Sequence, residues 1–384
     1  MLKCIMEVVQ EKYNRWWNNQ NERPILYFTS TENYISNYHL TRNSWDFTSE
    51  SNVKDQNTEK FWFDDELRIN SFLEGVKHTS YFKDSYPYFW VDYGPGILAG
   101  CIGVGLEFDF NTMWIPQSLE KYENLEEKLT IDRDNYYWRK LHKTTRKALD
   151  RSEGRYITSI TDIGGVMDVL AGIRGSNQFL KDLIRKPQKV KTAMEYLFDS
   201  WFELFNSLTE LLLDAQEAAV AWNGIYSELP TYTIQNDLSA MISPEMFNEF
   251  DMPYKEKLTE RIPNTIYHLD GPDALKHLDS ILSLSNLNAV QWVPGAGQPG
   301  GNTTAGGSSD GYWVNTGMLE WVDTLKKIKE AGKSLELWVH PQDVLPLIQS
   351  LGPERLLLKV ESVPSKSECK KVISQLVSEG LIDH

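Results

Sequence analysis

The alternation of short β-rich runs with helical patterns from Tyr86 onward limits the fold of this chain more than any other feature. Such alternation is the sequence signature of βα units that build a parallel sheet. The runs with the length and composition of strands are Tyr88–Val91, Tyr156–Ile160, Ala218–Trp222, Thr231–Ile234, Thr265–His268, Ala289–Trp292, Leu335–Val339 and Leu356–Val360. Eight such units are the number in a TIM-type (β/α)₈ barrel, which is the α/β fold that we predict.

The N-terminal 80 residues differ from the rest, because they are polar and aromatic and contain one clear strand candidate, Arg23–Phe28. We predict that residues 1–80 form an N-terminal extension that packs on a barrel formed by residues 81–384. A chain of 384 residues, of which 41% are hydrophobic, can bury one large core. Helix starts are also readable, since Ser243-Pro244 has an N-cap serine followed by proline at the first helical position.

Charge and hydropathy exclude several functional classes. The formal net charge is -15, with 39 basic and 54 acidic residues, which argues against binding to nucleic acids or to anionic membranes. No apolar run approaches the roughly 20 residues that span a bilayer, and Met1–Gln10 is too short and too charged for a signal peptide. We therefore expect a cytoplasmic protein. The three cysteines are far apart, so neither a disulfide framework nor a thiolate zinc cluster is expected.

The segment Thr265–Pro272 combines a β-type run with two side chains that can bind a metal, His268 and Asp270. In a parallel α/β barrel, residues at the carboxyl ends of the strands converge on one cavity. His268 and Asp270 lie two apart and share one face of the strand. They are candidate metal ligands, and a hydrogen-bonded pair without metal is the alternative.

Four segments carry a resemblance to a known enzyme superfamily. They are Val91–Gly96, Leu170–Gly175, Ile242–Phe247 and the His268-x-Asp270-Gly271 motif. Together these segments resemble the uroporphyrinogen decarboxylase superfamily, over roughly residues 23–364. The closer branch is that of the zinc-dependent methylcobalamin and coenzyme M methyltransferases. The resemblance implies a TIM-type barrel with its site at the carboxyl-end mouth.

The same resemblance implies a metal site with altered ligands. Enzymes of the methyltransferase branch bind zinc through a His-x-Cys pair on the fifth strand and a cysteine near the end of the eighth. Here His268 is retained, Asp270 replaces the first cysteine and Glu361 falls near the second. We predict zinc or another divalent metal at these three residues, with His340 as a candidate fourth group. Carboxylates are harder ligands than thiolates, which widens the choice toward manganese or iron.

Three functions from different classes follow. The first is a metal-assisted methyltransferase that acts on a small substrate, with a corrinoid protein as a candidate partner. The second is a lyase similar to uroporphyrinogen decarboxylase, and the third is a non-catalytic barrel that binds a small molecule. The decarboxylases hold their porphyrin-type substrate with an arginine-rich segment, where this chain reads Phe28-Thr29-Ser30-Thr31-Glu32. Because that clamp is missing, we predict no decarboxylation of uroporphyrinogen.

Further side chains at predicted strand ends complete the candidate site. The candidate catalytic residues are Asp92, Asp237 and His340, and Asp162 is expected at the same mouth. The candidate substrate-binding residues are Trp222, Tyr226, Gln291, Trp292 and Trp338. Tryptophan faces attract methylated ammonium groups, although packing between barrel and helices explains the same residues. The glycine-rich segment Pro294–Gly311 is expected to be either a lid or a surface insertion.

Overall fold

A central sheet of seven strands organises the molecule. The computed structural model describes residues 2–31, 62–109, 112–302 and 314–383. The strand order is β2-β1-β13-β12-β11-β10-β9, and every neighbouring pair is parallel except β1 with β2. The strands are β1 (Ile25–Thr31), β2 (Thr79–Lys83), β9 (Thr231–Gln235), β10 (Asn264–Asp270), β11 (Ala289–Val293), β12 (Ser334–Trp338) and β13 (Leu356–Val363).

Shorter strands complete the β structure. A parallel pair is formed by β3 (Tyr88–Trp90) and β6 (Ile157–Ser159), whereas β4 (Glu107–Phe108) with β5 (Met113–Trp114) and β7 (Ala219–Val220) with β8 (Tyr226–Ser227) are antiparallel. One backbone hydrogen bond, from Ile160 N to Val220 O at 3.0 Å, connects the end of β6 to β7. The strand ladders of the described residues do not close into a ring. The predicted α/β architecture is therefore confirmed, and the closed barrel stays a prediction.

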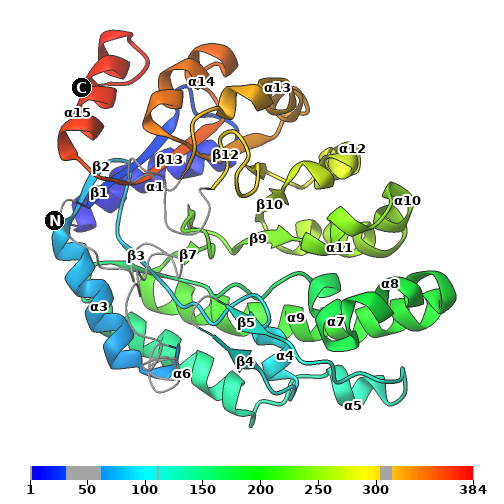
Figure 1. Cartoon of the computed structure of the whole chain (residues 1–384). Helices are drawn as coiled ribbons and strands as arrows, with labels where there is room; N and C mark the ends of the chain where they lie inside the picture. The colour runs from blue at the N-terminus through cyan, green and yellow to red at the C-terminus, as the bar shows by residue number, and fades with distance from the viewer. Residues whose placement is uncertain (1, 32–61, 110–111, 303–313, 384) are drawn as a thin grey trace, which may run out of the picture.

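Helices lie around the outside of the strands (Figure 1). They are α1 (Leu2–Trp17), α3 (Asp65–His78), α4 (Ile97–Cys101), α5 (Leu125–Leu129), α6 (Tyr136–Ser152), α7 (Val166–Arg174), α8 (Ser176–Arg185), α9 (Pro187–Gln216), α10 (Pro244–Met246), α11 (Met252–Arg261), α12 (Leu278–Leu282), α13 (Val322–Glu330), α14 (Val344–Leu351) and α15 (Lys366–Ser378). Within the described residues, no helix has the length and apolar character needed to cross a membrane.

Each predicted strand run overlaps an observed strand, but two of them pair differently from the expectation. The N-terminal run becomes β1, which lies inside the main sheet between β2 and β13. The N-terminal segment therefore supplies a strand to the sheet as well as packing on it. The run Ala218–Trp222 forms only the short strand β7, which turns back in a hairpin with β8.

The strands β9, β11 and β12 of the main sheet are buried on both faces, as is typical of parallel sheets covered by helices. In β12, Leu335 and Leu337 belong to the large hydrophobic core, while Glu336 between them points to the other face. The predicted helix start at Ser243 is confirmed, because its hydroxyl accepts a hydrogen bond from Met246 N at 3.3 Å.

Candidate metal centre

Three side chains that can bind a metal meet at the carboxyl ends of β9 and β10. Asp237, His268 and Asp270 each offer one ligand atom, and these atoms all lie within 4.8 Å of one another. His268 and Asp270 leave β10, and Asp237 opens the 3₁₀ helix η2 (Asp237–Met241), which follows β9 directly. The parallel register that places Gln235 beside His268 brings these two strand ends together. One imidazole and two carboxylates form a donor set suited to zinc or another divalent metal.

Hydrogen bonds to the backbone at and near Asp237 hold this residue in place. The Asp168 carboxylate accepts hydrogen bonds from Asp237 N at 3.1 Å and from Leu238 N at 2.8 Å. Lys255, which is buried, donates to the carbonyl of Gln235 at 2.7 Å. The end of β9 is therefore fixed from two sides, and the side chain of Asp237 is left exposed.

Glycine is required at position 165, where the segment before α7 approaches the end of β9. We call the hydrogen bonds of Asp168 to Asp237 N and Leu238 N the clamp on Asp237. A Cβ atom on Gly165 would lie 2.3 Å from the Asp168 carboxylate and 2.6 Å from the carbonyl oxygen of Gln235. No side chain fits such contacts, so a glycine here lets the segment before α7 pack against the end of β9.

Two carboxyl groups beside Asp237 have a raised pKa. Burial raises the pKa of Asp270, the charge of Asp237 adds to this shift, and His268 opposes it. Burial raises the pKa of Asp168 to about 8, with a further contribution from Asp237. A bound cation would lower the pKa of these carboxyl groups, because it favours their charged form.

His268 itself is tethered on one side of its ring. Its Nδ1 atom is hydrogen-bonded to Oε1 of Gln291, which is fully buried on β11. The ring of Trp222 meets the His268 ring edge-on at 5.5 Å between centroids, and Trp222 Nε1 donates to Thr233 O at 2.9 Å. With Nδ1 engaged, Nε2 is the nitrogen left for a metal.

Glu361, the third predicted ligand, lies elsewhere. Its carboxylate is 3.5 Å from the ammonium nitrogen of Lys359, and it does not belong to the group formed by Asp237, His268 and Asp270. The register between β1 and β13 shifts at this point, and Ser362 has a left-handed φ of 58°. This β-bulge redirects the side chains at the end of β13. The structure thus brings two of the three predicted ligands together and adds Asp237, which was predicted to be a catalytic acid.

A buried charged network lies beside Glu361. Glu336 and Lys359 are both fully buried; Asn223 Nδ2 donates to Glu336 Oε2 at 2.6 Å and Lys359 Nζ donates to Asn223 O at 2.7 Å. The Lys359 ammonium also lies over the rings of Tyr27, Tyr88 and Trp338, at 5.1 to 5.5 Å. Burial raises the pKa of Glu336 to about 7, although Lys359 opposes the shift.

The remaining predicted catalytic residues have structural partners. Asp92, and Asp162, which was predicted only to lie at the same mouth, follow β3 and β6, and each accepts a hydrogen bond at 2.8 Å from the backbone N–H two residues later. Both aspartates therefore shape tight turns. His340 is buried, and its Nδ1 accepts from Gln342 N at 3.3 Å, which caps the helical turn before α14.

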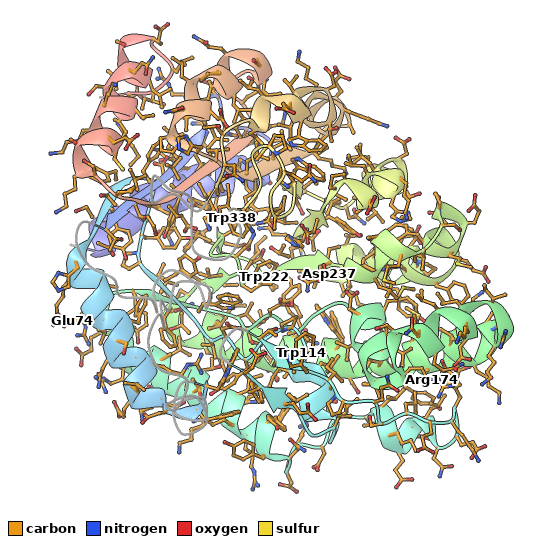
Figure 2. The ribbon with its side chains drawn as sticks, viewed as in Figure 1. Glu74, Trp114, Arg174, Trp222, Asp237 and Trp338 are labelled. Carbon is orange, nitrogen blue, oxygen red and sulfur yellow. The ribbon has the colours of Figure 1, made fainter. Side chains whose placement is uncertain are left out.

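The predicted substrate-binding residues separate into two sets. Trp222, Gln291 and Trp338 are on the same side as His268 and the buried network, and Figure 2 shows Trp222, Trp338 and Asp237 inside the surrounding helices. Trp292 faces the other side of the sheet and packs on Trp321 at 5.1 Å. Tyr226 is buried in a second hydrophobic cluster with residues of α1. The geometry therefore gives Trp292 and Tyr226 packing roles.

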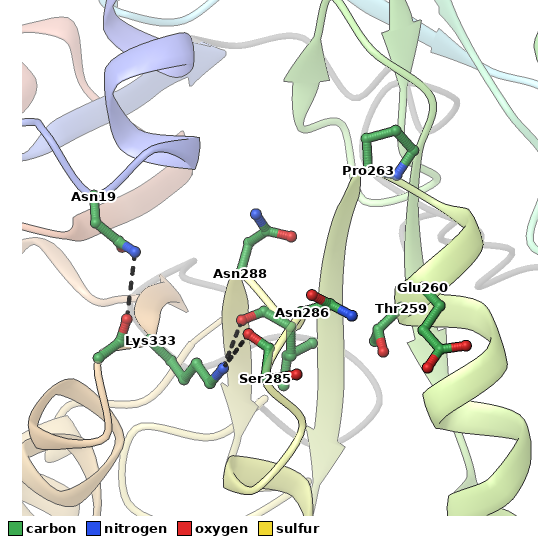
Figure 3. Close-up of a pocket in the computed structure, with 10 residues that line it drawn as sticks. Asn19, Thr259, Glu260, Pro263, Ser285, Asn286, Asn288 and Lys333 are labelled. Carbon is green, nitrogen blue, oxygen red and sulfur yellow. Dashed lines mark hydrogen bonds between the residues drawn. The ribbon is translucent and has the colours of Figure 1, made fainter.

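Of the segment Pro294–Gly311, residues 303–311 lie outside the described residues, as does Glu32. A pocket of about 500 Å³ lies at the opposite, amino-terminal edge of β10 to β12 (Figure 3). In it, the Lys333 ammonium already donates to the carbonyls of Leu284 and Leu287 at 2.6 and 2.8 Å. This pocket is separate from the metal-binding side chains.

Comparison with known proteins shows the fold. The structure is similar to that of a methyltransferase from Methanosarcina mazei, with a TM-score of 0.58 and 11% sequence identity. The match covers 97% of this chain and 99% of the other. No family model and no curated protein sequence matches the chain. At this identity the likeness shows a common fold over nearly the whole length, and the superfamily resemblance drawn from sequence motifs stays a prediction.

The residues that the sequence did not point to are Asp168, Asn223, Glu336 and Lys359. Glu336 and Lys359 had a readable signal, since each is a charged residue inside a strand of otherwise apolar residues. A charge in such a position is rarely buried without a partner. Asp168 had no comparable signal, because its contact with η2 joins segments about 70 residues apart.

Proposed function

We propose that this chain is a metal-assisted methyltransferase with a (β/α)₈-type barrel related to the uroporphyrinogen decarboxylase superfamily. The observation that carries the proposal is the convergence of Asp237, His268 and Asp270 at the carboxyl ends of two parallel strands. Active sites of α/β barrels lie at that edge. The fold shared with a methyltransferase over 97% of the chain supports the reaction class.

The three side chains would hold one divalent cation through a nitrogen and two oxygen atoms. The cation would supply a Lewis acid that polarises an oxygen or sulfur atom of a small substrate. Asp168 and Lys255 keep the Asp237 backbone in place, while Gln291 orients His268. Trp222 packs against the imidazole in a T-shaped arrangement. A corrinoid protein that carries the methyl group is the partner that we propose.

The charge of the site favours a neutral or cationic substrate. Asp237 and Asp270 are exposed acids, and Lys359, the cation of the neighbouring network, is already engaged by a carbonyl and a carboxylate. The described part of β1, where the decarboxylases have arginines, reads Thr29, Ser30 and Thr31. A porphyrinogen with eight carboxylates would be repelled here. The decarboxylase alternative therefore has less support.

Metal content and methyl transfer test this proposal together. Protein reconstituted with zinc, manganese or iron is expected to hold one equivalent of metal per chain. His268→Ala and Asp270→Asn should lose it, and Asp237→Asn should weaken binding by at least tenfold. Glu361→Gln is the matched control, because this carboxylate lies outside the group, and it should retain full metal content.

The activity assay follows the release of cob(I)alamin from methylcobalamin, free or protein-bound, in the presence of small thiols and alcohols. Activity that depends on the metal and disappears in His268→Ala supports the proposal. Stoichiometric metal without methyl transfer to any acceptor would contradict the methyltransferase, and absence of metal after all three reconstitutions would contradict the metal centre.

A further inference from the structure

Three polar side chains form a row across neighbouring strands beneath the metal-binding group. The parallel register pairs Glu336 on β12 with Gln291 on β11, and Gln291 with His268 on β10. Side chains at paired positions point to the same face, and adjacent strands lie about 4.8 Å apart. Glu336 and Gln291 are fully buried, whereas His268 is half-buried at the edge. The row therefore runs from the interior to the candidate metal centre, and we call Glu336, Gln291 and His268 together the relay.

Hydrogen bonding at both ends of the row limits how Gln291 can be oriented. Its Oε1 atom is bonded to His268 Nδ1. Glu336 Oε2 is occupied by Asn223 Nδ2 at 2.6 Å. Among the described residues, Gln291 Nε2 and Glu336 Oε1 are buried without another hydrogen-bond partner. Because these two groups occupy paired positions on neighbouring strands, the amide is placed to donate to the carboxylate, and hydrogen bonding by Gln291 lowers the pKa of Glu336, against the larger effect of burial.

The chemistry of the three groups then dictates a single pattern of protons. An ionised carboxylate only accepts hydrogen bonds, so it attracts the NH₂ group of Gln291 and turns the amide oxygen toward His268. The amide oxygen also only accepts, so His268 must carry its proton on Nδ1. The lone pair of the neutral imidazole then lies on Nε2.

We propose that Glu336 and Gln291 act as positioning residues that hold His268 in the Nδ1–H tautomer and direct the Nε2 lone pair toward Asp237 and Asp270. This inference rests on the proposed metal-binding role of His268. Partners that orient a ligating histidine commonly change metal affinity by 10- to 100-fold when they are removed. Asn223 holds Glu336 by a hydrogen bond, and Lys359 holds Asn223 and favours the charged form of Glu336.

Nuclear magnetic resonance on metal-free protein tests the tautomer directly. Long-range ¹H–¹⁵N spectra of histidine-labelled protein at pH 8 distinguish a protonated Nδ1 from a protonated Nε2, and His268→Asn identifies the signal of His268. The wild type is expected to show the Nδ1–H tautomer. Gln291→Met and the isosteric Glu336→Gln should each shift His268 toward a mixture of tautomers. Glu361→Gln, a carboxylate of the same interior outside the row, should leave the signal unchanged.

Metal titration of the same variants supplies the second readout. Gln291→Met and Glu336→Gln are expected to weaken metal binding by 10- to 100-fold, less than His268→Ala does. Thermal melting identifies a variant that fails to fold. If Gln291→Met does not fold, the tautomer and the metal affinity of the isosteric Glu336→Gln decide whether the proposal holds. A wild-type His268 with its proton on Nε2 would overturn the relay, as would variants with unchanged tautomer and affinity.

The relay and the metal function fail in different ways. The predicted tautomer in a protein that binds no metal would support the relay and refute the metal centre. Tight metal binding by a wild-type protein whose His268 carries its proton on Nε2 would refute the relay and leave the metal centre intact.

Discussion

Two neighbouring regions of the same sheet contain acidic side chains in different surroundings. We call them the first edge, formed by β9 and β10, and the second edge, formed by β12 and β13. At the ends of β9 and β10, Asp237 and Asp270 are exposed, and each has a carboxylate oxygen within 4.8 Å of a ring nitrogen of His268. At β12 and β13, Glu336 and Glu361 face the buried ammonium of Lys359.

Among the described residues, Lys359 lies 3.5 Å from Glu361 at the second edge, whereas no lysine or arginine forms an ion pair with Asp237 or Asp270 at the first. Lys255, beside the first edge, is engaged by Asp251 and by the Gln235 carbonyl. The comparison predicts that acidic residues near a strand end hold a metal only where no internal cation pairs with them.

Removal of the internal cation should give the largest effect. Lys359→Met leaves Glu336 and Glu361 without their partner and keeps the aliphatic volume. Loss of one member of a buried ion pair typically costs 3–5 kcal/mol, so the free energy of unfolding in urea should fall by about that amount. Asp237→Asn is the matched change at the exposed edge and should alter stability by less than about 1 kcal/mol. Equal losses for both variants would remove the distinction between the two edges.

Titration of Glu336 should separate the edges by pH. Burial raises its folded-state pKa from 4.5 to about 7, so between these values the folded state binds more protons than the unfolded state. Stability should therefore be highest below about pH 4.5, decline by up to about 1.4 kcal/mol per pH unit as pH rises to about 7, and then level off for this group.

The measurement compares wild type with Glu336→Gln in urea at several pH values. The difference in unfolding free energy should move in favour of Glu336→Gln as pH rises from 4.5 to 7. A difference that is independent of pH would show that Glu336 stays charged from pH 4.5 to 7. Lys359 alone would then balance its charge.

The clamp on Asp237 should give a smaller effect on stability and a measurable one on metal binding. Asp168→Ala removes the acceptor for two backbone N–H groups, which typically costs about 1–2 kcal/mol. Metal affinity should fall by about tenfold, because Asp237 is then less well oriented. Isothermal titration calorimetry measures the metal affinity, and urea unfolding measures the stability. Asp182→Ala, which changes an aspartate of the next helix, is the control for affinity. Unchanged affinity in Asp168→Ala would mean that Asp237 needs no such support.

The sequence predicts the strands well because their signal is local. Runs such as Ala289–Trp292 and Leu356–Val360 are short and mostly apolar, and they become β11 and β13. The place of β1 could not be read in the same way, because its pairing with β13 joins residues more than 300 positions apart. Likewise, the hairpin of β7 with β8 depends on the turn between them, which the expected barrel order did not include.

The candidate site was predictable only where both ligands lie on one strand. His268 and Asp270 share a face of β10 by simple alternation. Glu361 was placed by its position near the end of a strand, but the bulge at Ser362 adds a residue and changes the direction of the chain. The sequence identifies Asp237 as a candidate catalytic acid, and only the register between β9 and β10 places it beside His268.

X-ray absorption spectroscopy of the zinc-loaded protein tests the central claim most directly, because it reports which atoms surround the metal. The account predicts a first shell of nitrogen and oxygen at about 2.0–2.2 Å with one imidazole. His268→Ala is expected not to hold the metal, so no such shell should be seen in it; the shell should change in Asp237→Asn and stay unchanged in Glu361→Gln. A shell without imidazole, or one that changes in Glu361→Gln and not in Asp237→Asn, would contradict it.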